Sequence, residues 1–204
     1  MTSPFHQIAP QYVELWSETS RGRAQRKQVW REIDGLFKLG YRVLDLGCGI
    51  GDDAVHLMSR GVNVLGIDSA PGMVEIARNR GVDAKGMAIE ELGSLVDMFD
   101  GAISNFGALN CVANLSELSE GLARLIRPQG KLALCVMSRY CWLTDWRHLG
   151  QRWSGHASWR EVDVYYRSAR SIVRAFAPHF DYERRVSIGR GDHQLLVFKR
   201  SSEC

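Results

Sequence analysis

The stretch VLDLGCGIGDDAVHL, Val43 to Leu57, joins a short apolar run to an amphipathic segment through three glycines in five positions. The apolar run predicts a buried strand, and the residues from Asp52 onward predict a helix. Glycine tolerates left-handed backbone and lets another group approach closely. In open α/β sheets, ligands bind at the carboxyl ends of parallel strands next to such loops. The stretch therefore predicts an α/β fold with a ligand site at this loop.

The charges around the loop decide which ligand it suits. A dinucleotide loop needs a third glycine, but that position holds Asp52. A pyrophosphate would also lie at the helix start, where Asp52 and Asp53 follow the glycines and Asp45 precedes them. Carboxylates repel a phosphate at close range. A ligand with cationic groups and no phosphate fits better, and S-adenosylmethionine has an ammonium, a sulfonium, a ribose and an adenine.

Strand and helix patterns alternate along the rest of the chain. Apolar runs at 63–68, 100–105 and 131–138 alternate with helical segments that begin near Pro71, Ser116 and Ser168, which predicts a parallel sheet. Residues 24–38 predict a surface helix, and residues 180–200 predict an antiparallel hairpin. We expect one domain, 1–204, divided into a helical cap (1–40), a cofactor-binding core (41–138), an insertion or lid (139–167) and a C-terminal helix and hairpin (168–204).

Composition excludes several classes of protein. The chain has 204 residues, 45% of them hydrophobic, which suits a single core. The five cysteines include no CxxC pair, and the six histidines show no ligand spacing, so we expect free thiols and no metal. No apolar window approaches the roughly 20 residues of a membrane span, and no signal peptide is evident, so a cytoplasmic protein is expected. A net charge of +3 does not indicate nucleic acid.

The pattern Asp45-x-Gly47-x-Gly49-x-Gly51 resembles the first motif of class I S-adenosylmethionine-dependent methyltransferases. VLGIDSAPGMVEIAR (64–78) resembles the second strand of that family with its acidic tip, and FDGAISNFGALNCV (99–112) and RPQGKLALCVMSR (127–139) resemble the fourth and fifth strands of bacterial small-molecule members. The resemblance implies a Rossmann-like, doubly wound, mostly parallel seven-stranded sheet with an antiparallel C-terminal hairpin and an N-terminal helical cap.

The resemblance also implies how S-adenosylmethionine would be held. Backbone at Gly47, Cys48 and Gly49 would approach its methionine part and ribose. Asp45 would face its α-ammonium, and Asp68 would accept both ribose hydroxyls. The remaining residues assigned in this way are Ser69 and Met73 at the adenine edge, and Asn105 and Phe106 at the methionine and methyl end.

The third strand departs from the family pattern, because Met87 stands where the family has an acidic residue that grips the adenine amino group. Adenine recognition would then rest on the backbone amides of Ala88 and Ile89, with Glu90 as a substitute acceptor. In the N-terminal segment, Tyr12 is either a lid over the cofactor or an ordinary packing residue. Arg26 is a candidate partner for the cofactor carboxylate.

The implied reaction is methyl transfer to a small-molecule acceptor by in-line displacement. The insertion, which is short and rich in Trp and Tyr, favours this interpretation. The sequence identifies no catalytic base; Tyr140, His148 and Tyr166 lie in regions that could overhang the site. Two alternatives remain: an RNA or protein methyltransferase that docks through its arginine-rich N-terminal segment, and a non-catalytic S-adenosylmethionine-binding protein. No membrane or nucleic-acid partner is expected, and the protein would be a monomer or a homodimer.

Overall fold

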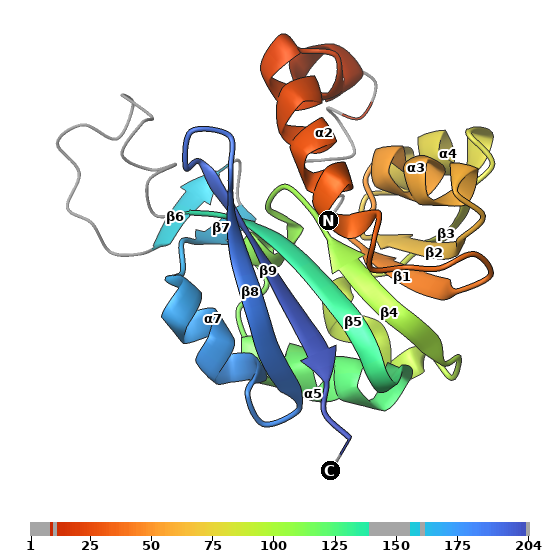
Figure 1. Cartoon of the computed structure of the whole chain (residues 1–204). Coiled ribbons are helices and arrows are strands. Elements are labelled where there is room, and N and C mark those ends of the chain that lie inside the picture. Colours follow the sequence, from red (N-terminus) through yellow and green to blue (C-terminus); the bar gives the residue numbers. More distant parts are fainter. Residues whose placement is uncertain (1–8, 10–11, 139–155, 160–161, 203–204) are drawn as a thin grey trace, which may run out of the picture.

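The computed structural model describes residues 9, 12–138, 156–159 and 162–202. Seven strands form one sheet in the order β3-β2-β1-β4-β5-β9-β8 (Figure 1). The pairs among β1 to β5 are parallel, and β9 is antiparallel to both β5 and β8. The strands are β1 (Arg42–Leu46), β2 (Asn63–Asp68), β3 (Asp83–Gly86), β4 (Phe99–Ser104), β5 (Ile126–Met137), β8 (Phe180–Ile188) and β9 (His193–Arg200). This is the expected doubly wound, Rossmann-like sheet with its antiparallel C-terminal hairpin.

Helices cover both faces of the sheet. The face formed by Val43, Val64 and Ile103 packs against α2, α3 and α4, and the face formed by Leu44, Leu65 and Leu134 packs against α5 and α7 (Figure 1). Alternate residues of one strand point to opposite faces, which is why neighbouring residues of β1 enter different core clusters. The helical elements are η1 (Val13–Ser17), α2 (Ser20–Ile33), α3 (Asp52–Ser59), α4 (Pro71–Asn79), η2 (Ile89–Ser94), η3 (Ala108–Cys111), α5 (Leu115–Leu125) and α7 (Ala169–Phe176).

The helix expected over residues 24–38 begins and ends earlier, since α2 spans Ser20–Ile33. Its start is fixed by Thr19, whose hydroxyl accepts a hydrogen bond from the Gly22 amide at 2.9 Å. Side-chain acceptors at this position satisfy amides that lack a partner within the helix. Thr19 carries no apolar periodicity, so the hydrophobic pattern alone missed this turn of the helix.

The segment after β5 contains a separate two-stranded antiparallel sheet of β6 (His156–Trp159) and β7 (Val162–Tyr165). Most of the predicted insertion, including Tyr140, His148 and three of its tryptophans, lies outside the described residues. Tyr166 is described and is half-buried just after β7.

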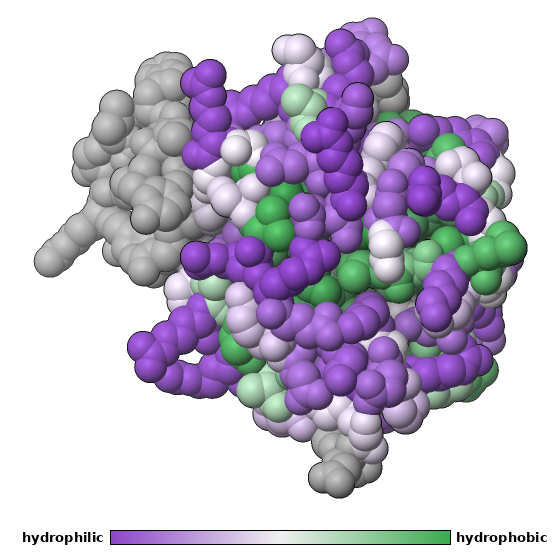
Figure 2. Space-filling view, in the orientation of Figure 1, coloured by the Kyte–Doolittle hydropathy of each residue, from purple (hydrophilic) through white to green (hydrophobic). Residues whose placement is uncertain are grey.

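The side of the molecule seen in Figure 2 is largely hydrophilic, with apolar residues in a band across its middle. Among the described helices, none has the length and apolar character needed to cross a membrane.

A matched pair of leucines tests the position of the core. Leu44 in β1 is fully buried, whereas Leu39 is 82% exposed. We expect Leu44→Ala to lower the free energy of unfolding by about 2–5 kcal/mol, and Leu39→Ala to change it by less than about 0.5 kcal/mol. Urea denaturation of both variants measures the difference. Similar values for the two would show that β1 is not the centre of the core.

Candidate functional site

The glycine loop after β1 is closed against the neighbouring strand. The amides of Gly47 and Cys48 both donate to the carbonyl of Ile67, at 2.8 and 2.9 Å. Gly47 has a φ of +70°, and a Cβ added there would lie 2.3 Å from the Cβ of Ala108. Only glycine suits this position, because both the backbone angle and the close approach exclude a side chain. The loop lies between β2 and β4, where the strand order reverses and open sheets bind ligands.

Asp68 is held rigidly at the end of β2 by two backbone amides. Its Oδ2 accepts from the Gly49 amide at 2.9 Å and its Oδ1 from the Ala70 amide at 2.8 Å. Burial raises the pKa of this carboxyl, while the two amides act in the opposite direction. Each oxygen keeps a second lone pair, so the carboxylate can still accept hydrogen bonds from a ligand. Its neighbour Ser69 is exposed.

Asp45 presents a buried carboxylate oxygen without a partner. The residue is 2% exposed, and its Oδ2 has no hydrogen-bond partner within the described part of the chain. Burial raises the pKa of this carboxyl well above its usual range; Asp53 adds to the rise and Arg26 opposes it. An unpaired buried charge strongly destabilises a protein. The end of β1 therefore has the character of a cation site.

A buried ion-pair network fixes α2 on α3. The guanidinium of Arg26 lies 3.0 Å from Asp53 and 3.2 Å from Asp52, and the Trp30 indole N–H donates to Asp53 at 2.7 Å. Both aspartates begin α3, and their side chains also bind α2. Arg26 also lies over the Phe106 ring, 5.0 Å from its centroid.

Arg26 retains one group that the network does not use. Its Nε is buried and has no hydrogen-bond partner among the described residues. The predicted contact with a cofactor carboxylate can use this Nε, which the pairs with Asp52 and Asp53 leave unengaged. Sequence reasoning missed these ion pairs. Arg26 and Asp53 lie 27 residues apart along the chain, and no local pattern links them.

The N-terminal segment lies over the glycine loop. Tyr12 packs against a small apolar cluster made of Ala9, Ile50, Ala70 and Met73. Burial raises the pKa of Tyr12 to about 12, and Arg26, Asp53, Asp52 and Asp68 all act on it electrostatically. Met73 is 2% exposed. Tyr12 and Met73 therefore lie together between the glycine loop and the start of α4, as the cap interpretation requires.

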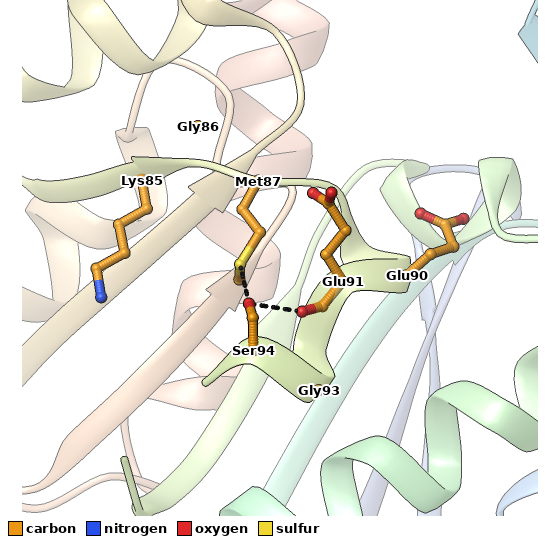
Figure 3. A pocket seen from close by; sticks show the side chains of 7 residues that line it. All are labelled: Lys85, Gly86, Met87, Glu90, Glu91, Gly93 and Ser94. Atoms are coloured by element: carbon orange, nitrogen blue, oxygen red, sulfur yellow. Dashed lines mark hydrogen bonds between the residues drawn. The ribbon is translucent and has the colours of Figure 1, made fainter. Parts of the chain in front are cut away.

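Past the end of β3, the residues expected near adenine have different surroundings. Met87 packs partly on the core, and its sulfur accepts a hydrogen bond from the Ser94 hydroxyl at 3.3 Å (Figure 3). The amide of Ala88 donates to Glu91 at 2.8 Å, so this amide is already engaged. Ile89 is half-buried against the same core cluster. An open hollow lined by Lys85, Gly86, Met87, Glu90, Glu91, Gly93 and Ser94 lies beside them (Figure 3).

Glu90 is exposed and forms no hydrogen bond or ion pair with the described residues. Its carboxylate and that of Asp68 act on the same group, the Cys111 thiol, whose pKa is raised to about 11 by burial and by these two charges. Both carboxylates are thus close enough to Cys111 to act on it electrostatically. By contrast Cys48 is buried beside the loop, and burial raises the pKa of its thiol, which makes it a packing residue and not a nucleophile.

At the end of β4, Asn105 is buried with both amide atoms lacking a partner among the described residues. Phe106 follows with a φ of +54°, a conformation that is strained for a bulky residue. Its ring contacts Trp16 in η1 and His193 in β9, with centroids 6.0 and 5.5 Å apart. Sequence reasoning missed Trp16 and His193, which lie far from the motif; the only signal was a histidine directly before the apolar run LLVF of β9.

Buried polar atoms without partners gather at this edge of the sheet. Such atoms are rare in folded proteins and need an explanation. Those near the carboxyl ends of β1, β4 and β5, within the described residues, are Asp45 Oδ2, Asn105 Oδ1 and Nδ2, Arg26 Nε, Trp16 Nε1 and His193 Nδ1. A bound polar ligand with cationic and hydrogen-bonding groups would satisfy them. The described residues contain no group of His, Cys, Asp and Glu that could hold a metal ion.

Comparison with known proteins gives consistent results. A family model described as a methyltransferase domain matches residues 14–183. The ubiquinone biosynthesis O-methyltransferase of Xanthomonas oryzae is 32% identical over 106 residues, which cover 49% of this chain and 44% of the relative. The demethylmenaquinone methyltransferase of Paenarthrobacter aurescens is 31% identical over 150 residues, covering 71% and 57%. The chain thus spans about half the length of the curated relatives it matches.

A solved structure shares the fold. The 1,6-didemethyltoxoflavin-N1-methyltransferase of Burkholderia thailandensis, with S-adenosylhomocysteine bound, superposes with a TM-score of 0.69 at 18% identity, covering 97% of this chain and 86% of that one. The matched domain, the sheet order and the glycine loop agree with one another. The chain therefore belongs to the methyltransferase domain family, the class I S-adenosylmethionine-dependent methyltransferases.

Proposed function

We propose that this protein transfers a methyl group from S-adenosylmethionine to a small organic acceptor. The observation that carries this proposal is the buried, unpartnered Oδ2 of Asp45 beside the glycine loop. A charge-assisted hydrogen bond from an ammonium group would satisfy that oxygen. The α-ammonium of S-adenosylmethionine supplies such a group, whereas a phosphate would be repelled there.

The ribose and adenine would be held by residues from β2, α4 and η2. Asp68, already oriented by two amides, would accept the ribose hydroxyls with its remaining lone pairs. Met73 and Tyr12 would provide an apolar surface for the adenine ring. Glu90 remains the proposed acceptor for the adenine amino group because it is exposed and lines the hollow past β3, whereas the Ala88 amide is engaged by Glu91.

The methionine end would lie between the loop and β4. Backbone at Gly47, Cys48 and Gly49 would line its chain, the Nε of Arg26 would donate to its carboxylate, and Asn105 and Phe106 would adjoin the methyl group. S-adenosylmethionine, when bound, supplies a methyl group activated by a sulfonium cation. The chain's own contribution is to hold the acceptor in line with that group, since positioning alone can provide effective molarities of about 10⁵ M or more.

The relatives support an aromatic acceptor. They are named as methyltransferases of ubiquinone and menaquinone biosynthesis, one acting on oxygen and one on demethylmenaquinone. Trp16, Phe106 and His193 form an aromatic cluster next to the proposed methyl position. Aromatic side chains provide large apolar contact areas for flat ligands. We therefore favour an aromatic small molecule over RNA or protein as the acceptor.

Ligand-induced stabilisation tests the choice of cofactor. S-adenosylhomocysteine should raise the melting temperature in a thermal shift assay, because at about a hundredfold excess over Kd a ligand adds about 2.7 kcal/mol to stability. NAD, with its pyrophosphate, should leave the melting temperature unchanged. Stabilisation by NAD alone would contradict the charge argument.

Asp45→Asn should change stability and affinity in opposite directions. The raised pKa of Asp45 means that the folded chain binds its proton more tightly than the unfolded chain does, so this carboxyl lowers stability as pH rises above about 4. The isosteric amide lacks that effect, and the variant should unfold at a higher urea concentration than the wild type at neutral pH. Its affinity for S-adenosylhomocysteine should fall by about 10–100-fold, since hydrogen bonds to charged groups contribute about 1.5–3 kcal/mol.

The control is Asp83→Asn, which removes the same charge at the exposed start of β3. This substitution should change neither the stability nor the affinity for S-adenosylhomocysteine. Calorimetric titration and urea denaturation of the three proteins, with denaturation repeated at acidic and neutral pH, measure both effects. A variant that loses stability while keeping its affinity would show that Asp45 is a structural residue.

A further inference from the structure

His193 lies at the edge of the sheet where the proposed methyl transfer takes place. It is the first residue of β9 and pairs with Met137, the last residue of β5. Leu195 and Val197, which follow it at every second position, enter the core cluster on the α2 and α3 face. Its ring therefore points to the face that also carries Arg26 and Phe106, and the Phe106 centroid is 5.5 Å away.

The imidazole of His193 is buried, and its Nδ1 has no hydrogen-bond partner among the described residues. The residue is 5% exposed. The indole Nε1 of Trp16, a donor, is also buried without such a partner, and the two ring centroids are 6.2 Å apart. A histidine that serves only as core packing normally has its ring nitrogens satisfied. The Trp16 N–H is a hydrogen-bond donor, and Nδ1 of a neutral imidazole can be an acceptor. One small polar group between the two rings would satisfy both atoms.

Burial keeps the His193 ring neutral. Burial lowers the pKa of His193 to about 4; Asp192, in the turn just before β9, opposes this, and Arg21 from α2 adds to it. Asp192 is itself paired with Arg21 at 2.6 Å and accepts from Gln25 at 3.0 Å. Arg26 lies over the Phe106 ring and is paired with Asp53. The imidazole is thus a neutral hydrogen-bond acceptor at physiological pH.

We propose that His193 takes the proton of the acceptor's hydroxyl group through Nδ1, while the Trp16 N–H donates to the same oxygen, so that the acceptor is an aromatic compound with an ionisable hydroxyl. This inference rests on the proposed function. A lone pair of the acceptor oxygen forms the new bond to the methyl carbon as the S–CH₃ bond breaks, and the electron pair of that bond returns to sulfur. The O–H proton passes to Nδ1 and then to water.

Phe106 is a positioning residue in this arrangement. Its φ is strained, and its ring contacts the rings of Trp16 and His193 while Arg26 lies over it. Strained backbone persists where the surroundings enforce it, and functional sites are common places for it. The ring therefore provides an apolar surface beside the imidazole for a flat acceptor.

Two variants of His193 test the proton transfer. His193→Asn keeps a polar atom near the position of Nδ1 but cannot take a proton, and His193→Phe keeps the aromatic packing alone. The control is His179→Asn. His179 lies in the turn before β8, at the end of the β8–β9 hairpin opposite to His193. The acceptors are catechol, a nitrocatechol that is already ionised at neutral pH, and thiophenol, and formation of S-adenosylhomocysteine is measured by mass spectrometry.

The wild type and His179→Asn should methylate both catechols. His193→Asn should lose about 10²-fold or more in kcat/KM on catechol, the range of general base catalysis, and far less on the nitrocatechol, which already offers one ionised oxygen to the methyl group. Both His193 variants should keep the wild-type affinity for S-adenosylhomocysteine in calorimetric titrations. Equal losses on the two catechols, or no loss, would overturn the proposal.

A binding measurement does not depend on turnover. In the complex with S-adenosylhomocysteine, catechol should shift the imidazole resonances of ¹⁵N-labelled His193, identified by their absence in His193→Asn. A wild type that binds S-adenosylhomocysteine and methylates thiophenol but neither catechol, or whose His193 signals do not respond to catechol, would contradict this inference and leave the proposed function intact. Failure to bind S-adenosylhomocysteine at all would instead contradict the proposed function.

Discussion

An imbalance of buried charge at the carboxyl end of β1 governs this site. Asp45 and Asp53 are both buried, and Arg26 is the one buried cation that the described residues place with them. The guanidinium lies between Asp53 and Asp52, and Asp45 Oδ2 remains unpaired. Burying a second carboxylate without a counterion is unfavourable. The fold tolerates it at the place where the proposed ligand would bring an ammonium group.

The same ion pair links the fold to the proposed chemistry. It fixes α2 on α3, and Gln25 of the same helix reaches Asp192 of the C-terminal hairpin. Helix α2 therefore joins the glycine loop to β9, and Arg26 supports the Phe106 ring against His193. One helix outside the sheet thus aligns the proposed cofactor end and the proposed acceptor end. Removing Arg26 would leave two buried carboxylates uncompensated, which strongly destabilises a protein.

The sequence predicted the parts of this structure that depend on local patterns. The glycine loop, the acidic tip at Asp68 and the starts of α3 and α4 follow from residues close together in the chain. The contact between Arg26 and Asp53, and the cluster of Trp16 with His193, join distant segments, so no periodicity or motif could reveal them. Met87 was only partly predictable. The sequence shows that it departs from the family pattern, but its hydrogen bond with Ser94 depends on how η2 packs.

The central claim is that Asp45 pairs with a cation of the cofactor, and proton release on binding tests it most directly. Calorimetric titration of S-adenosylhomocysteine at mildly acidic pH, in buffers of different ionisation enthalpy, counts the protons exchanged. An ammonium beside Asp45 would lower its raised pKa, so the wild type should release protons and Asp45→Asn should release fewer. Binding with no proton release, or with the same release in both proteins, would contradict the claim.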